Sequence, residues 1–318
     1  IFSTSIKTDT DKVFSQIKIA IRSQGFDIPI LQFLFSSINQ ENDLPLKSLS
    51  YFIHWMSLDV ILKEESLSLI LECVRKPSTS AAALDCLTSL IDRGMDEGLK
   101  CQIIDSLQIA AQVRLICCSN ANNEILYSAA RLIEVTGTFL INTEQCLPYY
   151  HIALLLLNND DYKISACVTT FIQQFTKKYP DNAFNVLTNA LARLKEFYEK
   201  MYTSDDIDFT YSSENEAYRE LLFGIIRTCF VVDFEESLQS IVSKCQDIDI
   251  IEEMPYCIAL LEILNDQSPQ PEFVQYFEPI LSMVPPLSPV QLKALSCFSR
   301  YFCNVANSFD ASTISNFS

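Results

Sequence analysis

Apolar residues recur at steps of three and four along most of the chain, which is the pattern of helices that bury one face. Val13, Ile17 and Ile21 follow this pattern near the N-terminus. Roughly fifteen helical segments are predicted in this way. They span residues 9–24, 28–40, 45–60, 64–75, 78–93, 97–114, 121–141, 144–158, 161–178, 182–202, 214–231, 234–245, 249–264, 271–283 and 288–306.

Short polar or proline-containing stretches separate these segments. Pro77 separates the segments 64–75 and 78–93, and Gly94 follows the second of these. Pro180 separates the segments 161–178 and 182–202. Pro, Asn, Asp and Ser at such junctions end one helix and begin the next, so Ser78 and Asp181 are predicted N-caps. Strands have little support, because no Gly-rich turns flank alternating runs.

Helices joined by short loops indicate stacked antiparallel hairpins. The spacing of about 35 to 45 residues between hairpins is typical of HEAT or armadillo units. The predicted fold class is therefore all-α, a HEAT/armadillo-like α-α superhelical solenoid, and a compact helical bundle is the alternative. We expect residues 1–318 to form a single solenoid segment. Because the chain opens at Ile1 and not at Met, we expect it to be a fragment of a longer protein.

One polar stretch breaks the helical rhythm. Residues 201–216, called here the acidic segment, have no helical period and are predicted to form an unusually long inter-helix loop. The surrounding residues 201–253 hold 13 Asp and Glu but only 3 Lys and Arg. This surface is either a solvated face that keeps the protein soluble or an electrostatic binding site for a basic partner.

Composition narrows the class of protein. A formal charge of −17 argues against a surface that is basic throughout, as a general binder of duplex DNA or anionic membranes would have. The 12 cysteines form no CxxC motif and fall mostly within apolar runs, which favours a reducing cytosolic or nuclear compartment. The longest aliphatic run, Ile152 to Leu157, is too short to cross a bilayer, so no membrane partner is predicted.

Signatures of catalysis and of metal binding are missing from the sequence. His54 and His151 are the only histidines, and both fall within apolar helical patterns, so we expect them to be partly buried structural residues. The phosphate-binding, dinucleotide-binding, serine-hydrolase and zinc-protease motifs do not occur. We therefore predict no catalytic residues, no metal site, no cofactor and no enzymatic activity.

A modest basic cluster lies before the acidic segment. It consists of Lys177, Lys178, Arg193, Lys195 and Lys200. These residues form either the solvent-exposed face of helices or a contact surface for nucleic acid. Arg193 is the first candidate for a phosphate contact, because guanidinium matches phosphate geometry.

Two stretches resemble the exportin-T family of tRNA export receptors. Residues 49–61 place Tyr51, Trp55 and Leu58 as in the helix ends of nuclear export receptors, and residues 81–96 contain Asp85-Cys86-Leu87 followed by Gly94-Met95-Asp96. Arg93 stands where the family pattern has Lys. Further similarity runs in order through residues 132–141, 154–161 and 214–219.

The resemblance implies a nuclear export receptor of the karyopherin superfamily. Such receptors are HEAT-repeat solenoids, not enzymes, and load cargo with Ran GTPase in its GTP form. They pass between nucleus and cytoplasm through the nuclear pore, where nucleoporins are further partners. The implied cargo is tRNA, and the first repeats of the family are expected upstream of Ile1. By analogy the candidate Ran-binding residues are Asp205, Asp206, Asp208, Glu214, Glu216 and Arg219.

Two alternatives remain open at this point. Within the superfamily, the chain fits a protein-cargo exportin or a transportin-like import receptor. From a different class, a HEAT or armadillo scaffold without a transport role has the same helical pattern.

Overall fold

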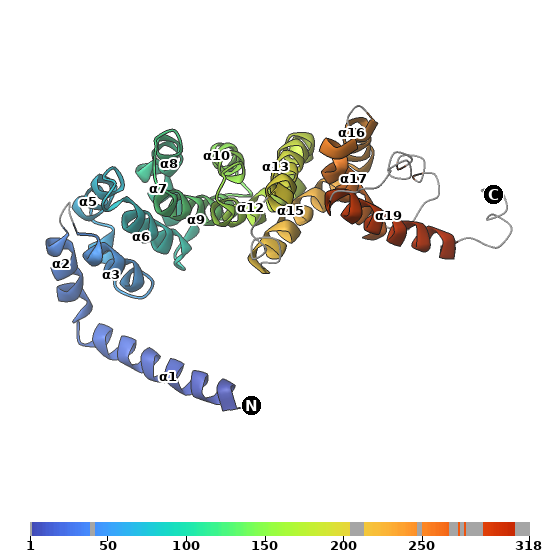
Figure 1. The fold of residues 1–318 in the computed structure, drawn as a ribbon. Coiled ribbons are helices and arrows are strands. Elements are labelled where there is room, and N and C mark those ends of the chain that lie inside the picture. The colour runs from blue at the N-terminus through green and yellow to red at the C-terminus, as the bar shows by residue number, and fades with distance from the viewer. Residues whose placement is uncertain are drawn as a thin grey trace. The chain divides into compact units, whose positions relative to one another are not determined.

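The computed structural model describes residues 2–38, 42–203, 213–246, 250–266, 273, 277 and 289–308. Side chains are described over slightly shorter ranges. These are residues 13–38, 42–200, 213–244, 254–265, 273, 277 and 291–306. The regular elements in these ranges are all helices, mostly α with two short 3₁₀ turns (Figure 1). The predicted all-α solenoid class is confirmed. Helix 271–283 of the sequence prediction lies almost entirely outside the described residues.

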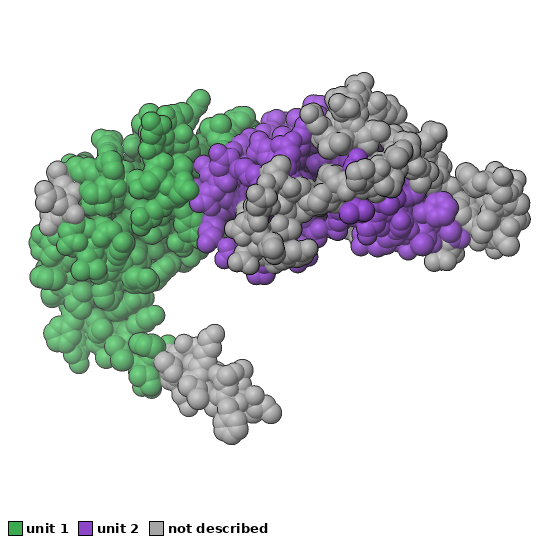
Figure 2. All heavy atoms as spheres, viewed as in Figure 1, with its two compact units in different colours: residues 1–156 green, residues 157–318 purple. Residues whose placement is uncertain are grey.

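The chain forms two compact units, residues 1–156 and 157–318, shown in separate colours in Figure 2. The first unit contains α1 (Phe2–Ser23), α2 (Asp27–Ser37), α3 (Leu44–Ile53), α4 (Leu58–Ile61), α5 (Glu64–Val74), α6 (Ser80–Asp92), α7 (Glu97–Leu107), α8 (Ile109–Cys117), α9 (Asn123–Phe139), the 3₁₀ turn η1 (Glu144–Cys146) and α10 (Leu147–Leu157), whose last residue falls in the second unit.

Helix α6 is the centre of the first unit. It packs against α3 on one side and α9 on the other, while α5 covers it from a third direction (Figure 1). Ala82 and Ala83 are buried and small, and so are Ala129 and Ala130 of α9. Small side chains let neighbouring helix axes approach closely, and the larger Leu87 fills the space between them.

The second unit repeats this arrangement around α15. It contains α11 (Tyr162–Cys167), α12 (Thr169–Lys178), the 3₁₀ turn η2 (Pro180–Asn182), α13 (Ala183–Thr203), α15 (Ser213–Val232), α16 (Phe234–Gln246), α17 (Ile250–Asp266) and α19 (Pro289–Ser308). Helix α15 packs against α12 and α13, and α17 packs most extensively against α19. Most helices thus bury an apolar stripe against sequence neighbours, as in repeat proteins. Helix α1 does not, because Val13 and Ile17 are 55% and 48% exposed. That residues 1–318 form one continuous solenoid segment stays a prediction.

Most helix positions agree with the periodicity, but three predicted helices are interrupted. Segment 97–114 is divided between α7 and α8 at Gln108, whose φ of 48° lies in the left-handed region. Segment 161–178 is divided at Val168, and segment 45–60 ends at Ile53 before the short helix α4. In each case the apolar spacing continues across the break, so periodicity alone does not reveal it.

The predicted caps are off by one or two residues. Helix α6 begins at Ser80, so Ser78 is not its N-cap; the Thr79 hydroxyl precedes the helix and donates to the Cys73 carbonyl. Asp181 lies in η2, immediately before α13. Asp96, in the Gly-Met-Asp stretch, caps α7 by accepting a hydrogen bond from the Leu99 amide.

Candidate functional site

The helices on either side of the acidic segment reach further into it than predicted. Helix α13 continues through Thr203 and α15 begins at Ser213, so both ends of the segment 201–216 are helical. Asp205, Asp206 and Asp208 lie outside the described residues. The predicted site is therefore described only where its acidic residues enter α15.

Glu214 and Glu216 lie in the first turn of α15 with their side chains in solvent. Each side chain is 75% exposed. Glu214 Oε2 lies 3.7 Å from Lys163 Nζ, and Glu216 Oε1 lies 3.7 Å from Arg219 Nη2. The Lys163–Glu214 pair is exposed on both sides, and such pairs contribute little to stability. The position of both glutamates at a helix N-terminus is favourable for negative charge. Both carboxylates are thus accessible to a basic partner.

Arg219, the remaining member of the predicted Ran-binding set, faces the protein. Its side chain is only 17% exposed, and Nη2 lies 3.1 Å from Glu220 Oε1. On its other side Nη1 lies 3.8 Å from Glu262 of α17, which also pairs with Lys293 of α19 at 3.6 Å. Arg219 therefore joins α15 to the helices that follow it.

The five predicted basic residues do not form one surface. Lys177 and Lys178 are exposed in the last turn of α12, next to the start of α13. Lys200 is near the other end of α13, and the rise from Ala183 to Lys200 is roughly 25 Å. Lys195 pairs with Glu199 at 3.8 Å, and Lys200 with Asp160 at 3.2 Å.

Arg193 was the first candidate for a phosphate contact, but its side chain is only 1% exposed. Nη1 pairs with Glu196 and lies 3.8 Å from Asp160 Oδ1, while the guanidinium carbon is 5.4 Å from the centre of the Tyr162 ring. Burial opposes the charged form, but Tyr218 and Glu196 outweigh it and raise the Arg193 pKa. The expectation of an accessible guanidinium at this position is wrong, because the helix face that carries Arg193 packs inward.

Arg193 belongs to a buried chain of hydrogen bonds that the sequence analysis did not find. Arg193 Nε donates to the Tyr218 hydroxyl at 3.1 Å, and that hydroxyl lies 2.7 Å from Ser165 Oγ. Ser165 Oγ in turn donates to the Leu157 carbonyl at 2.7 Å. The Tyr162 ring stacks on the Tyr218 ring, with centroids 4.9 Å apart. This chain connects α13, α15 and α11 with the last residue of α10.

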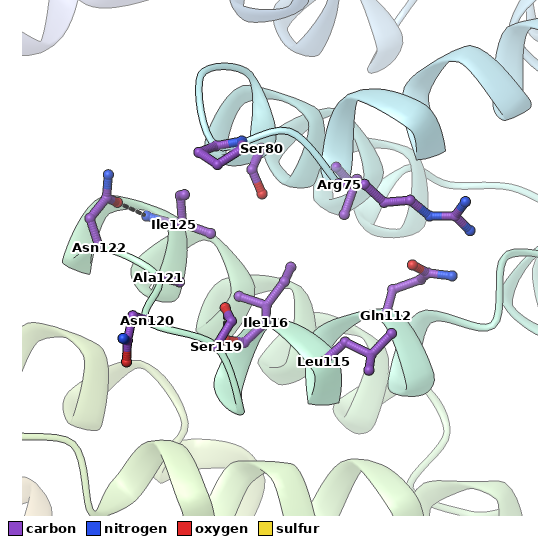
Figure 3. Close-up of a pocket in the computed structure, with 12 residues that line it drawn as sticks. Arg75, Ser80, Gln112, Leu115, Ile116, Ser119, Asn120, Ala121, Asn122 and Ile125 are labelled. Atoms are coloured by element: carbon purple, nitrogen blue, oxygen red, sulfur yellow. Dashed lines mark hydrogen bonds between the residues drawn. The ribbon is translucent and has the colours of Figure 1, made fainter.

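A second candidate surface lies in the first unit, in a groove between α5–α6 and α8–α9 (Figure 3). We call it the α5–α9 groove, and its volume is about 570 Å³. Val74 and Ile125 are buried in its wall, whereas Leu115 is 69% exposed. Arg75 and Gln112 supply polar groups at its edge. The mixture of apolar wall and polar edge is typical of a shallow peptide-binding groove.

The histidines and cysteines show no arrangement for chemistry in the described part of the chain. His54 and His151 are both exposed, so the expectation that they are partly buried is wrong. Burial raises the pKa of Cys117 to about 11 and that of Cys229 to about 12, which keeps both thiols protonated at neutral pH. The cysteines with described side chains are free thiols. Within the same residues, no group of His, Cys, Asp or Glu is placed to hold a metal ion.

A search for membrane-spanning helices among the described residues found none with the required length and apolar character.

One comparison with known proteins gives a family match in the N-terminal part of the chain. Residues 1–87, which include α1 to α5 and the first half of α6, match the family model of exportin 1-like proteins. A comparison with curated proteins gives no significant match. The match covers 87 of the 318 residues, so it shows what this part of the chain is similar to.

Proposed function

We propose that this chain is part of a nuclear export receptor that binds Ran GTPase in its GTP form together with cargo. The observation that carries the proposal is the exportin 1-like match over residues 1–87 in a chain built of stacked helical hairpins. Stacked hairpins offer long surfaces that grip macromolecules by shape and charge. A receptor of this kind passes between nucleus and cytoplasm through the nuclear pore.

The acidic segment is the proposed contact with Ran. Its candidate residues are Asp205, Asp206, Asp208, Glu214 and Glu216, and Arg219 follows the segment as the remaining candidate. The exposure of Glu214 and Glu216 supports this role, since each of the two side chains is 75% exposed. Complementary charge would speed association and make it dependent on salt.

The proposed cargo is tRNA, which is recognised by shape and backbone charge. Lys177, Lys178, Lys195 and Lys200 are the candidates for phosphate contacts, and the chain's charge of −17 confines such contacts to local patches. Arg193 is assigned an internal role below. A protein cargo is the alternative within the superfamily.

Nucleoporins are the third class of proposed partner, and the α5–α9 groove is their proposed site. Their phenylalanine-glycine repeats present single aromatic side chains, which a shallow groove with an apolar wall and an exposed Leu115 accommodates.

Pull-down of the whole chain with Ran·GTP and with Ran·GDP tests the proposal. We expect retention of Ran·GTP and little of Ran·GDP. Equal retention of both forms, or retention of neither, would favour a helical scaffold without a transport role. Filter binding of tRNA with and without Ran·GTP then separates the cargo classes, because only a tRNA exporter gains tRNA affinity when Ran·GTP is added.

A further inference from the structure

The two helices that enter the acidic segment are joined to each other by polar side chains inside the second unit. Arg193 of α13 and Tyr218 of α15 are 25 residues apart in sequence, and their hydrogen bond of 3.1 Å is buried. Ser165 of α11 completes the connection at 0% exposure, and Tyr218 is 3% exposed. We call Arg193, Tyr218 and Ser165 the clamp.

The donor and the acceptor of each hydrogen bond in the clamp can be assigned in only one way. The Ser165 hydroxyl has one proton, which it donates to the Leu157 carbonyl. The Tyr218 hydroxyl must therefore donate to Ser165 Oγ, and it accepts the proton of Arg193 Nε. Burial raises the pKa of Tyr218, which keeps this donor protonated. Since each hydroxyl both donates and accepts, losing one group leaves another buried group unsatisfied.

The clamp acts close to the acidic residues. Tyr218 is about one and a half turns from the start of α15, and Glu214 lies one turn before it on the same helix face. Glu216 lies between them. Because a helix transmits displacement along its length, the position of the Tyr218 hydroxyl fixes the position of the helix turn that carries both glutamates.

We propose that the clamp holds the start of α15 against the middle of α13, so that the first turn of α15, with Glu214 and Glu216, is presented to the basic partner in one fixed position. Arg193 is then a positioning residue and contacts no RNA. Its burial and its pairing with Glu196 fit a positioning role better than they fit a contact with phosphate. The proposal rests on the proposed function only in taking Ran·GTP as the partner.

Hydrogen exchange in the whole chain without a partner tests the first part of the proposal, that the clamp holds the two helices together. Tyr218→Phe keeps the ring that stacks on Tyr162 but removes the hydroxyl shared by Arg193 and Ser165. We expect exchange to accelerate about three- to tenfold in peptides covering 190–197 and 213–222, as for the loss of a buried hydrogen bond. Peptides of α6 should be unchanged. Tyr51→Phe, on an exposed tyrosine, is the matched control. Unchanged exchange in both peptides would overturn the clamp.

Binding of Ran·GTP, at a temperature where every variant is folded, tests the second part of the proposal, that the clamp presents the two glutamates to the partner. Tyr218→Phe should weaken affinity by about three- to tenfold while leaving the slope of affinity against salt unchanged, because no surface charge is altered. Ile258→Val, a conservative truncation at a fully buried position of α17, is the stability control and should keep wild-type affinity. Ser165→Ala should reproduce the loss, and the double variant should lose less than the sum of both.

The outcomes separate this proposal from the proposed function. Faster exchange with unchanged Ran affinity would overturn positioning while leaving the receptor intact. Failure of the wild-type chain to bind Ran·GTP would overturn the proposed function and the assigned partner, whereas the exchange experiment would still decide whether the clamp holds α15 against α13.

Discussion

Arg93 Nη1 donates to the Ile53 carbonyl at 2.6 Å, across the interface between α6 and α3. The same nitrogen donates to the Met56 carbonyl, also at 2.6 Å. Both carbonyls lie where α3 ends, and the last carbonyls of a helix have no partner within it. A cation at this position also interacts favourably with the helix dipole. Arg93, the C-cap residue of α6, thus completes the end of a neighbouring helix.

Removing this connection should destabilise the first unit. Arg93→Ala leaves two carbonyls without their charged donor, and we expect the free energy of unfolding to fall by about 1.5–3 kcal/mol. Arg93→Lys should lose less, because one ammonium still reaches a carbonyl. Urea denaturation measures both changes. Arg114→Ala, on the exposed face of α8, should stay within about 0.5 kcal/mol of wild type; an equal loss there would contradict the assignment.

Leu87 tests the packing of α6 without touching any proposed binding surface. It is 1% exposed, and Leu87→Ala should lower the free energy of unfolding by about 2–5 kcal/mol, as expected for a truncation that leaves a cavity. Binding of Ran·GTP by the folded variant should be unchanged. Thermal and urea denaturation provide the measurement, and a loss below about 1 kcal/mol would show that α6 is loosely packed.

Neutralising the described acids should change partner binding and its response to salt. Glu214→Gln with Glu216→Gln should weaken Ran·GTP affinity at low salt and flatten its salt dependence, with little effect on the melting temperature because both side chains are exposed. Asp205→Lys with Asp206→Lys should act in the same direction.

The matched control for this charge change is Glu64→Gln with Glu65→Gln, two exposed acids in the first turn of α5. Affinity measured at several salt concentrations compares the two pairs. If both pairs weaken binding equally, net charge and not the acidic segment governs association.

The α5–α9 groove predicts a specific effect of one exposed leucine. Leu115→Ser should reduce binding of a phenylalanine-glycine repeat peptide, because the groove loses an apolar side chain at its edge. Leu155→Ser, at a leucine that is 54% exposed on α10 and outside the groove, is the control. Titration of a labelled peptide measures both. Equal affinity of Leu115→Ser and wild type would remove the groove from consideration.

Adjacent cysteines should differ sharply in reactivity. Cys118 is exposed, whereas burial raises the pKa of Cys117 to about 11. At pH 8 the thiolate fraction of Cys117 is therefore very small, and alkylation of the native protein should modify Cys118 and Cys303 while sparing Cys117 and Cys229. Mass spectrometry after timed labelling gives the comparison. In urea all four should react, and rapid native labelling of Cys117 would contradict the described packing of α8.

Much of the fold was predictable because helix signals are local. Apolar spacing at Val13, Ile17 and Ile21 predicted the helix α1 correctly, but the buried face predicted there is wrong because Val13 and Ile17 are exposed. Similar spacing placed most later helices within a few residues. The interruption at Gln108 was missed because a Gln has the left-handed backbone conformation there. Gly is the residue that usually marks such a position in a sequence. The N-cap of α6 was predicted at Ser78 and lies at Thr79, because several consecutive residues there could begin a helix.

The candidate site was predictable only in part. Clustering of acidic residues in the sequence identified Glu214 and Glu216, and their exposure in the structure agrees with an accessible surface. The basic cluster was grouped by proximity in sequence, yet α13 separates Lys178 from Lys200 along most of its length. Nearness along a helical chain does not ensure nearness on its surface.

The sequence alone determined the helices, their approximate ends and the concentration of negative charge, since each of these depends on residues within a few positions of one another. Only the tertiary structure decided which polar groups are buried and what satisfies them. Arg193 meets Tyr218 across 25 residues and Tyr218 meets Ser165 across 53. Such pairs depend on how helices stack, and an amphipathic pattern does not specify which neighbour a buried polar side chain will reach.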